Sequence, residues 1–393
     1  MKYAPAWLLA AAAACFMLVF SACKPDPVDP PGLSYPAVEA AFGGRIRLDS
    51  LAQYAGQPVP SYITKDNSLA NPITDAGATL GRVLFYDKNL SASQTVSCAS
   101  CHRQSLAFSD RLQASPGVNG QTARHSMRLV NARFANEVRF FWDERAVSLE
   151  DQTTRPIRDH AEMGFSGQGG DPSFADLLAR LGGIGYYKEL FAFVYGDSAV
   201  TEARIQQALA QFIRSIQSFD SRFDAGRAQA ANDGADFPNF TPQENQGKTL
   251  FLRPPVFGPG GVRVDGGAGC AGCHRAPEFD INPGSRNNGL ISSIAGGTDQ
   301  AVTRSPSLRD LVGAPGNNNG PFMHTGELLT LQEVIQHYDS GIQDNPNLDP
   351  RLRPGGSVQR LSLTQAEQDA LVAFLRTLGG TAVYTDARWS DPF

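Results

Sequence analysis

The sequence contains the pentapeptide Cys-x-x-Cys-His twice, at Cys98–His102 and at Cys270–His274. Two thiols at this spacing can form thioethers with the two vinyl groups of one porphyrin, and the next residue, His, can then bind the iron. We therefore predict two covalently bound haem c groups, each replacing much of a hydrophobic core. The predicted binding residues are Cys98, Cys101 and His102 for the first haem and Cys270, Cys273 and His274 for the second.

A zinc site or two disulfides are the alternative uses of these cysteines. A zinc site with four Cys ligands does not require a His directly after each second Cys. A disulfide inside Cys-x-x-Cys is strained and reducible, which suits redox enzymes rather than structural cross-links. Both alternatives explain the repeated pentapeptide less well than haem does.

The first 22 residues have the features of a signal peptide, with Lys2, an apolar run and small residues before Cys23. The segment Phe20-Ser21-Ala22-Cys23 is similar to a bacterial lipobox. We predict that residues 1–22 are removed and that the product is an exported, periplasm-facing lipoprotein, attached to a membrane through Cys23. Ordinary cleavage near Ala22 and an uncleaved anchor helix are the alternatives. Residues 23–36 are rich in proline, which predicts an extended tether.

The number of cysteines and the net charge bear on two further questions, whether a structural disulfide can form and whether nucleic acid is a partner. Of six cysteines, Cys15 lies in the predicted signal peptide and Cys23 is the predicted lipid site, which leaves four, all in the haem motifs. The mature monomer therefore has no cysteine for a structural disulfide. The formal net charge is −5, and no basic stripe is present that could neutralise phosphates. Nucleic acid is excluded as a partner on this ground.

Helical signals dominate the sequence, and strand signals are few and short. Apolar spacing and capping residues predict helices over 174–181, over 201–223, from Thr241, from Thr330 through Tyr338, and from Thr364 to Leu378. Thr241, Thr330 and Thr364 are each followed by Glu three residues later, which is the capping-box pattern.

The chain divides into two halves with similar sequence segments before their haem motifs. The haem motifs lie 172 positions apart, and the polar stretch 229–239 separates them. Leu80–Phe85 precedes the first motif as the similar Gln246–Phe251 precedes the second. We predict a mainly α fold with two cytochrome c-like haem domains and long loops, over residues 37–235 and 240–393, after the signal peptide and tether.

Further motifs occur in a fixed order around the two pentapeptides. They are Leu84-Phe85-Tyr86-Asp87, Ala107-Phe108-Ser109-Asp110, Phe141-Trp142-Asp143-Glu144-Arg145-Ala146, Leu149-Glu150-Asp151-Gln152, Glu162-Met163-Gly164 and Phe322-Met323-His324-Thr325-Gly326. With them, the chain from about Leu80 to Leu378 resembles the bacterial di-haem cytochrome c peroxidases and their relatives of the MauG type. The resemblance implies hydrogen peroxide as substrate, a small electron donor such as a monohaem cytochrome c, and often a homodimer.

The resemblance also assigns catalytic roles to three residues. Glu162 matches the carboxyl group that moves a proton between the peroxide oxygens, and burial in an apolar pocket would favour its neutral form. Gln152 matches the amide that hydrogen-bonds peroxide, and Trp142 matches the aromatic residue that relays electrons between the haems. Without the resemblance, the residue types alone would favour other interpretations. Glu162 would then be a surface carboxylate, Gln152 a helix-surface amide and Trp142 a core aromatic.

Three positions depart from the peroxidase pattern. Val118 stands where members that need reductive activation have a distal His, so we expect an open first haem that is active without prior reduction. Tyr338 stands where many members have a Met ligand and MauG has a Tyr ligand, so it is a candidate ligand of the second iron, with His337 as its competitor. His125 replaces an Asn of the family's calcium site, which leaves Asn319 and Pro321 as candidate calcium ligands.

Three functions remain in competition. The leading one is a peroxidase that reduces hydrogen peroxide to water with electrons from a small donor protein. The second is a MauG-like enzyme that uses peroxide to oxidise aromatic residues of a partner protein. The third is a pure electron carrier with two six-coordinate haems, which would leave Gln152 and Glu162 without a role.

Overall fold

The computed structural model of the chain describes residues 34–313, 316 and 318–393. The predicted signal peptide, Cys23 and nearly all of the predicted tether lie outside these residues, and helix α1 begins at Pro36. Within the described part of the chain, no helix has the length and apolar character that a membrane span requires.

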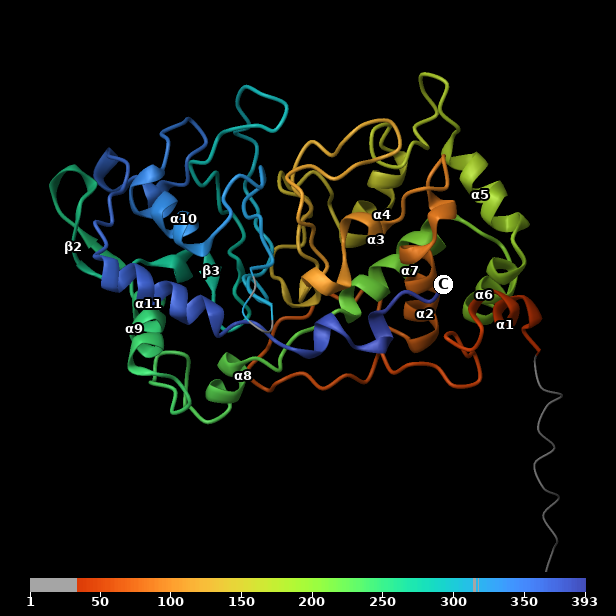
Figure 1. Ribbon diagram of the computed structural model, residues 1–393, viewed down its shortest axis with the longest axis horizontal. Helices are drawn as coiled ribbons and strands as arrows, with labels where there is room; N and C mark the ends of the chain where they lie inside the picture. Colours follow the sequence, from red (N-terminus) through yellow and green to blue (C-terminus); the bar gives the residue numbers. More distant parts are fainter. Residues whose placement is uncertain (1–33, 314–315, 317) are drawn as a thin grey trace, which may run out of the picture. The chain divides into compact units, whose positions relative to one another are not determined.

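The fold is mainly helical, as the sequence predicts, with two small sheets (Figure 1). The helices are α1 Pro36–Phe42, α2 Asp75–Tyr86, α3 Cys98–Cys101, α4 Leu149–Arg158, α5 Phe174–Gly183, α6 Gly185–Tyr195, α7 Glu202–Ser215, α8 Arg222–Arg227, α9 Pro242–Leu252, α10 Leu331–Gln336 and α11 Gln365–Arg376. The strands β1 Pro255–Phe257 and β2 Arg263–Gly266 form one antiparallel pair, and β3 His274–Arg275 and β4 Asp280–Ile281 form the other.

The predicted capping boxes are present. In α9, α10 and α11 the side chain of Thr241, Thr330 or Thr364 accepts a hydrogen bond from the third backbone N–H of the helix, and the Glu at that position bonds back. These reciprocal bonds satisfy backbone donors that a helix N-terminus would otherwise leave unpaired.

Two predicted helices end earlier than expected. Helix α7 stops at Ser215, where two carbonyl oxygens accept bonds from distant segments. The Gln57 amide donates to the carbonyl oxygen of Ser215 at 2.9 Å, and the backbone N–H of Asn131 donates to the carbonyl oxygen of Ile216 at 2.9 Å. These tertiary bonds replace the continuing helical ones. Helix α10 stops at Gln336, and Tyr338 lies in a π-helical turn over His337–Gly341.

The buried hydrophobic residues form two clusters, and a matching helix pair stands in each. Helix α2 packs on α7 in the first cluster, and α9 packs on α11 in the second (Figure 1). Gly81 of α2 lies against the carbonyl oxygen of Ala208, and Gly247 of α9 lies against that of Ala370, so closely that a Cβ would overlap the oxygen in both places. The shared Gly of Leu80–Phe85 and Gln246–Phe251 is therefore a close-packing residue.

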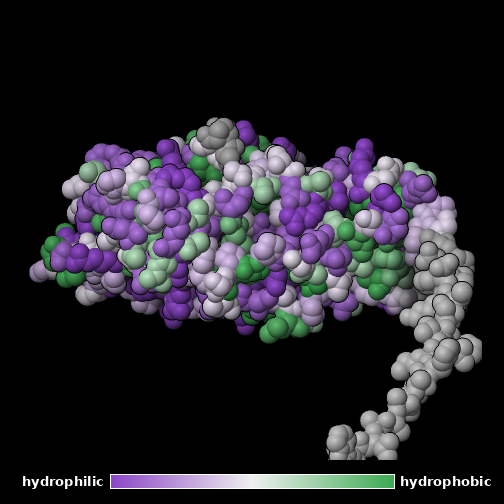
Figure 2. Space-filling model, turned by 90° about the horizontal axis from the view of Figure 1, so that it is seen from below, coloured by the Kyte–Doolittle hydropathy of each residue, from purple (hydrophilic) through white to green (hydrophobic). Residues whose placement is uncertain are grey.

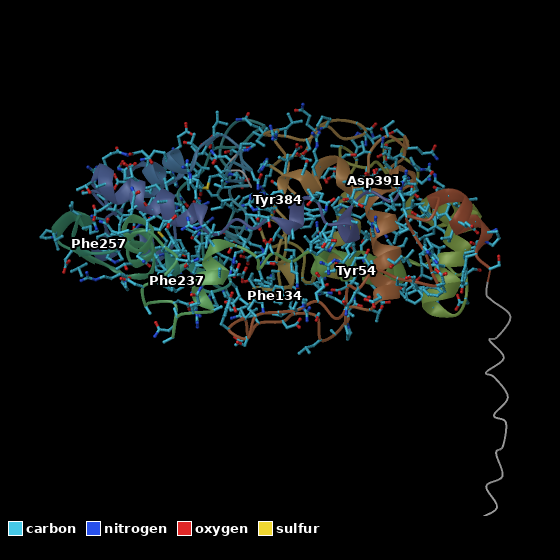
Figure 3. All side chains as sticks on the ribbon, turned by 60° about the horizontal axis from the view of Figure 1, so that its bottom comes forward. Tyr54, Phe134, Phe237, Phe257, Tyr384 and Asp391 are labelled. Carbon is cyan, nitrogen blue, oxygen red and sulfur yellow. The ribbon has the colours of Figure 1, made fainter. Side chains whose placement is uncertain are left out.

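The C-terminal segment returns to the first cluster after α11. Trp389 is 1% exposed and joins that cluster. Tyr86 donates to the carbonyl oxygen of Trp389 at 2.5 Å, and Tyr54 donates to that of Arg388 at 2.7 Å. Tyr54 and Asp391, two residues before the end of the chain, accordingly lie in the same part of the molecule in Figure 3. No pattern in the sequence indicated that the chain end packs there.

The β1–β2 hairpin presents apolar residues on two sides. Val256 and Val264 are 49% and 67% exposed, and Figure 2 shows hydrophobic residues at the left end, where Figure 1 draws this hairpin. Phe257, labelled in Figure 3, lines the second of the two cavities described below.

Candidate functional site

Each cysteine motif lines its own cavity. The first cavity, of about 200 Å³, is lined by Cys98, Cys101 and His102. The second, of about 550 Å³, is lined by Cys270, Cys273 and His274.

The state of the cysteines fits porphyrin attachment. All four are free thiols, and among the described residues no group of three or more His, Cys, Asp and Glu gathers to hold a metal ion. Two thiols and one imidazole that face a common cavity with largely apolar walls are what a covalently attached porphyrin needs. Neither the disulfide nor the zinc alternative finds support in this arrangement.

The imidazole of His102 is oriented by the turn that follows it. Its Nδ1 lies 3.1 Å from the carbonyl oxygen of Phe108, and Ala107 and Phe108 both adopt positive φ to bring that oxygen back. Burial lowers the pKa of His102, so the ring is neutral. A carbonyl partner at Nδ1 leaves Nε2 of a neutral imidazole as the metal-binding atom.

A turn one residue shorter follows the second motif, and Nδ1 of His274 lies 3.5 Å from the Ser305 hydroxyl. The backbone N–H of Phe108 bonds the carbonyl oxygen of Arg103 at 2.8 Å, and that of Phe279 bonds the carbonyl oxygen of Arg275 at 2.6 Å. Phe279 also has a positive φ. Burial lowers the pKa of His274 to about 4, which keeps this imidazole neutral as well.

Glu162 lines the first cavity from a loop that is braced on two sides. The Asp159 carboxylate accepts a hydrogen bond from the backbone N–H of Glu162 at 3.0 Å. The carbonyl oxygen of Glu162 accepts one from the backbone N–H of Val118 at 2.9 Å. Gly117 lies against the Glu162 backbone so closely that a Cβ could not be placed. Burial, with a smaller contribution from the negative charge of Asp159, raises the pKa of Glu162 to about 7.

The loop over residues 115–120 therefore positions Glu162. Val118 itself is not among the residues that line the first cavity. Of the described histidines, His102 and His125 line this cavity. The His125 ring is engaged elsewhere, with Nδ1 2.8 Å from the carbonyl oxygen of Leu112 and Nε2 3.4 Å from the Ser109 hydroxyl.

Gln152 and Trp142 complete this side of the first cavity. Gln152 lies on α4, and its side-chain amide has no hydrogen-bond partner among the described residues, so both its donor and its acceptor are free for a ligand. Trp142 lines both cavities and is nearly buried. Its ring makes an edge-to-face contact with His324 of the second cavity, with centroids 6.2 Å apart.

The two cavities share a wall. Residues 125–128, Trp142 and Arg304 line both of them. The segments of this wall are tied together, because the backbone N–H groups of Thr303 and Arg304 donate to the carbonyl oxygen of Trp142 at 2.9 and 3.0 Å. Sequence reasoning identified Trp142 here and missed the two arginines of this wall, Arg128 and Arg304.

Tyr338 lines the second cavity, and its competitor His337 does not. The His337 Nε2 lies 3.1 Å from the carbonyl oxygen of Asn288. The Asn288 amide donates to the Tyr338 hydroxyl at 3.2 Å and lies 3.6 Å from the sulfur of Met323, which also lines the cavity. Burial raises the pKa of Tyr338. Met323 is a second candidate ligand that sequence reasoning missed, although it stands directly before His324.

The residues predicted for calcium are engaged with the protein. Asn319 is buried, and its amide donates to the carbonyl oxygen of Asp310 and to the Tyr384 hydroxyl, both at 2.8 Å. Pro321 lines the second cavity. Burial lowers the pKa of His125 to about 4, so this residue offers a neutral ring nitrogen where calcium prefers oxygen. Within the described part of the chain, no group of three His, Cys, Asp or Glu side chains gathers here to hold a metal ion.

Comparison with known proteins places this arrangement among relatives. The family model for di-haem cytochrome c peroxidase matches residues 75–232. The methylamine utilization protein MauG of Methylophilus methylotrophus is 31% identical over 81% of this chain and 87% of its own length. The cytochrome-c peroxidase IdrP1 of Denitromonas iodatirespirans is 27% identical over 87% of this chain and 89% of its own.

A solved structure shares the fold. The crystal structure of a MauG-like protein associated with microbial copper homeostasis superposes with a TM-score of 0.65 at 28% identity, covering 86% of this chain and 99% of the other.

Proposed function

We propose a peroxidase function from the premise that this chain belongs to the di-haem cytochrome c peroxidase family. Its two Cys-x-x-Cys-His motifs bind two c-type haems, as the family name implies. The proposed reaction is the reduction of hydrogen peroxide to two waters, with two electrons from a small donor protein such as a monohaem cytochrome c and two protons from solvent. One observation carries the proposal: Glu162, Gln152 and the predicted iron ligand His102 line the same cavity.

The residues of the first cavity have the chemistry that peroxide cleavage requires. A haem held by Cys98, Cys101 and His102 would supply the redox centre for peroxide reduction. The carboxylate of Glu162 takes the proton from the inner peroxide oxygen and delivers it to the outer one, which leaves as water. The amide of Gln152 donates a hydrogen bond that orients the peroxide. A carboxyl group whose pKa is about 7 can both accept and return a proton near neutral pH.

Two further features support this assignment. Val118 offers no imidazole to the first cavity, so we propose that this haem reacts with peroxide without prior reduction. Trp142 lines both cavities and is proposed to relay electrons from the second haem to the first. The division into an N-terminal, peroxidatic domain over 37–235 and a C-terminal, electron-transfer domain over 240–393 stays a prediction, and Val383 and Trp389 of the second range pack in the first hydrophobic cluster.

A second candidate function is oxidation of aromatic residues in a partner protein, as in MauG. The observation that favours it is Tyr338, whose side chain reaches the second cavity from the π-helical turn. A phenolate ligand would stabilise ferric iron at that site.

The wider setting of the protein is part of the proposal. We propose export to the periplasm, membrane attachment through lipid on Cys23, and a homodimer. Calcium at Asn319 and Pro321 stays a prediction, with the side-chain arrangement around it unfavourable.

The deciding experiment mixes the as-isolated diferric protein with hydrogen peroxide in a stopped-flow spectrometer, then adds a reduced monohaem cytochrome c. Rapid spectral change without reductant, followed by oxidation of the cytochrome over many turnovers, is the result expected of a peroxidase. A Glu162→Gln variant should lose this turnover with both haems attached, whereas the exposed Glu39→Gln control on α1 should keep it. Full turnover by Glu162→Gln would overturn the assigned role.

A further inference from the structure

Two buried arginines lie in the wall between the cavities. Arg128 and Arg304 are 8% and 6% exposed, and each lines both the first and the second cavity. No other arginine among the described residues lines both cavities. The two guanidinium groups therefore border both predicted haem sites at once.

Neither guanidinium forms an ion pair with a carboxylate of the described residues. Arg128 donates through Nε to the carbonyl oxygen of Arg309 at 3.0 Å. Arg304 donates through Nη1 to the carbonyl oxygens of Glu137 and Arg139, at 2.9 and 2.6 Å, and stacks over Phe140. Their other guanidinium N–H groups have no partner among the described residues, and neither arginine has a carboxylate of those residues within 4 Å.

Two other buried arginines have carboxylate partners, whereas a third, Arg82, donates to the carbonyl oxygen and hydroxyl of Ser390 and lines neither cavity. Arg309 pairs with Asp224 at 2.8 Å, and Arg214 pairs with Glu150. Arg124, which lines only the first cavity, pairs with Asp143 and Asp299. Among the described residues, Arg128 and Arg304 are therefore the buried arginines that line a cavity and lack a carboxylate partner.

A buried cation is costly unless an anion compensates it. Burial lowers the pKa of both residues, yet a guanidinium stays charged in proteins. Each haem brings two propionate carboxylates into its cavity, and these are planar acceptors that match the guanidinium fork. We propose that Arg128 and Arg304 bind haem propionates, and that this one pair of arginines serves both haems.

Longer-range attraction to four carboxylates is the competing source of compensation: Glu137 and Glu144 act on Arg304 in this way, and two aspartates act on the pair as well. Asp280 lines the first cavity, where its carboxylate accepts the backbone N–H of Asn136 at 3.1 Å. Asp310, fully buried, accepts the backbone N–H of Gly380 at 2.8 Å. Both act on the arginines only through longer-range attraction. If they sufficed, loss of an arginine would alter stability and leave the haems electrostatically unchanged.

The consequence of propionate binding is electrostatic coupling. An uncompensated propionate stabilises ferric iron, because its negative charge favours the more positive metal. Loss of one shared guanidinium is therefore expected to lower the midpoint potential of both haems. We expect the reduction equilibrium of each haem to shift at least about tenfold, which is about 59 mV for a one-electron couple.

The test compares Arg128→Met and Arg304→Met with Arg263→Met. Arg263 is a matched control, since its largely buried guanidinium pairs with Glu367 at 2.8 Å and lines neither cavity. Spectroelectrochemical titration follows each haem, and a pyridine haemochrome assay counts the haems attached. Lower potentials at both haems in the two cavity variants, with unchanged potentials in Arg263→Met, support the proposal. A shift at one haem only, or at neither, overturns it.

Lysine variants keep the test decisive if a methionine variant loses haem. Arg128→Lys and Arg304→Lys keep the charge and lose the planar fork. They are expected to hold both potentials near the wild-type values and to shift the propionate-bending bands in resonance Raman spectra. Unchanged bands would contradict direct binding. These readouts depend on the two haems of the proposed function but not on turnover, so a protein inactive toward peroxide could still confirm or refute them.

Discussion

The indole N–H of Trp142 donates to the carbonyl oxygen of His125 at 2.7 Å. The backbone N–H of His125 in turn donates to the carbonyl oxygen of His324, also at 2.7 Å. His125 therefore links an aromatic residue of the first half to a segment of the second cavity. This chain of bonds holds the Trp142 ring in one orientation between the two cavities, which is the condition for a reproducible electron relay.

Replacing Trp142 by Phe tests the relay. Phe keeps an aromatic ring but removes the indole N–H and the larger π-system, so we expect electron transfer between the haems to slow at least tenfold. Rapid-mixing spectroscopy after partial reduction measures this rate. The free energy of unfolding should fall by about 1–3 kcal/mol, because the buried carbonyl of His125 loses its side-chain donor. An unchanged transfer rate would show that electrons take another path.

The pKa of Glu162 predicts how peroxide reactivity depends on pH. The carboxylate must be ionised to accept a proton from peroxide, and burial raises its pKa to about 7. The second-order rate of the diferric protein with peroxide should therefore rise as pH increases through about 7 and then level off. Stopped-flow rates between pH 5 and 9 are the measurement, and a flat profile would contradict the role of Glu162.

The same pKa predicts an effect on stability. The folded-state pKa of Glu162 lies above the ordinary value of 4.5. Its contribution to the free energy of unfolding is therefore complete below the unfolded-state pKa and is lost as pH rises toward and through about 7. Chemical denaturation at several pH values should show this decline in the wild type and a smaller one in Glu162→Gln. Equal slopes in both proteins would argue against a raised pKa.

Tyr338 can be tested as an iron ligand without reference to activity. Tyr338→Phe removes the hydroxyl that reaches the second cavity. If the phenolate binds iron, the electronic absorption and electron paramagnetic resonance spectra of the second haem should change and its potential should rise. His337→Gln is the control, because His337 bonds the Asn288 carbonyl and does not line the cavity. Unchanged spectra in Tyr338→Phe would leave Met323 as the candidate to examine.

Gly247 tests the close packing of α9 on α11. A Cβ at this position overlaps the carbonyl oxygen of Ala370, so Gly247→Ala should destabilise the protein by about 1–3 kcal/mol through overpacking. Gly182 in α5 has nothing within 4 Å of its added Cβ, and Gly182→Ala should instead be neutral or stabilise by up to about 1 kcal/mol. Thermal unfolding of both variants measures the difference, and equal effects would contradict the packing argument.

Much of the local structure could be predicted from the sequence because its causes are local. The Cys-x-x-Cys-His spacing places two thiols and one imidazole beside a common cavity in each half. The helix starts could be predicted, because the capping residues bond the first turns of their own helices, as Thr241, Thr330 and Thr364 do. Two α-helix ends could not be predicted. A bond from a distant segment sets the end at Ser215, and a change to a π-helical turn sets the end at Gln336.

What the sequence by itself determined is the set of chemical groups: the two haem attachment sites, the capped helices and the family motifs around Glu162 and Trp142. Only the tertiary structure decided that Arg128 and Arg304 border both cavities with no carboxylate of the described residues within 4 Å, and that Trp389 joins the first hydrophobic cluster. The physical reason is the distance along the chain over which each interaction acts. Thioether spacing and capping act within a few residues, whereas the desolvation of a guanidinium depends on which distant segments surround it.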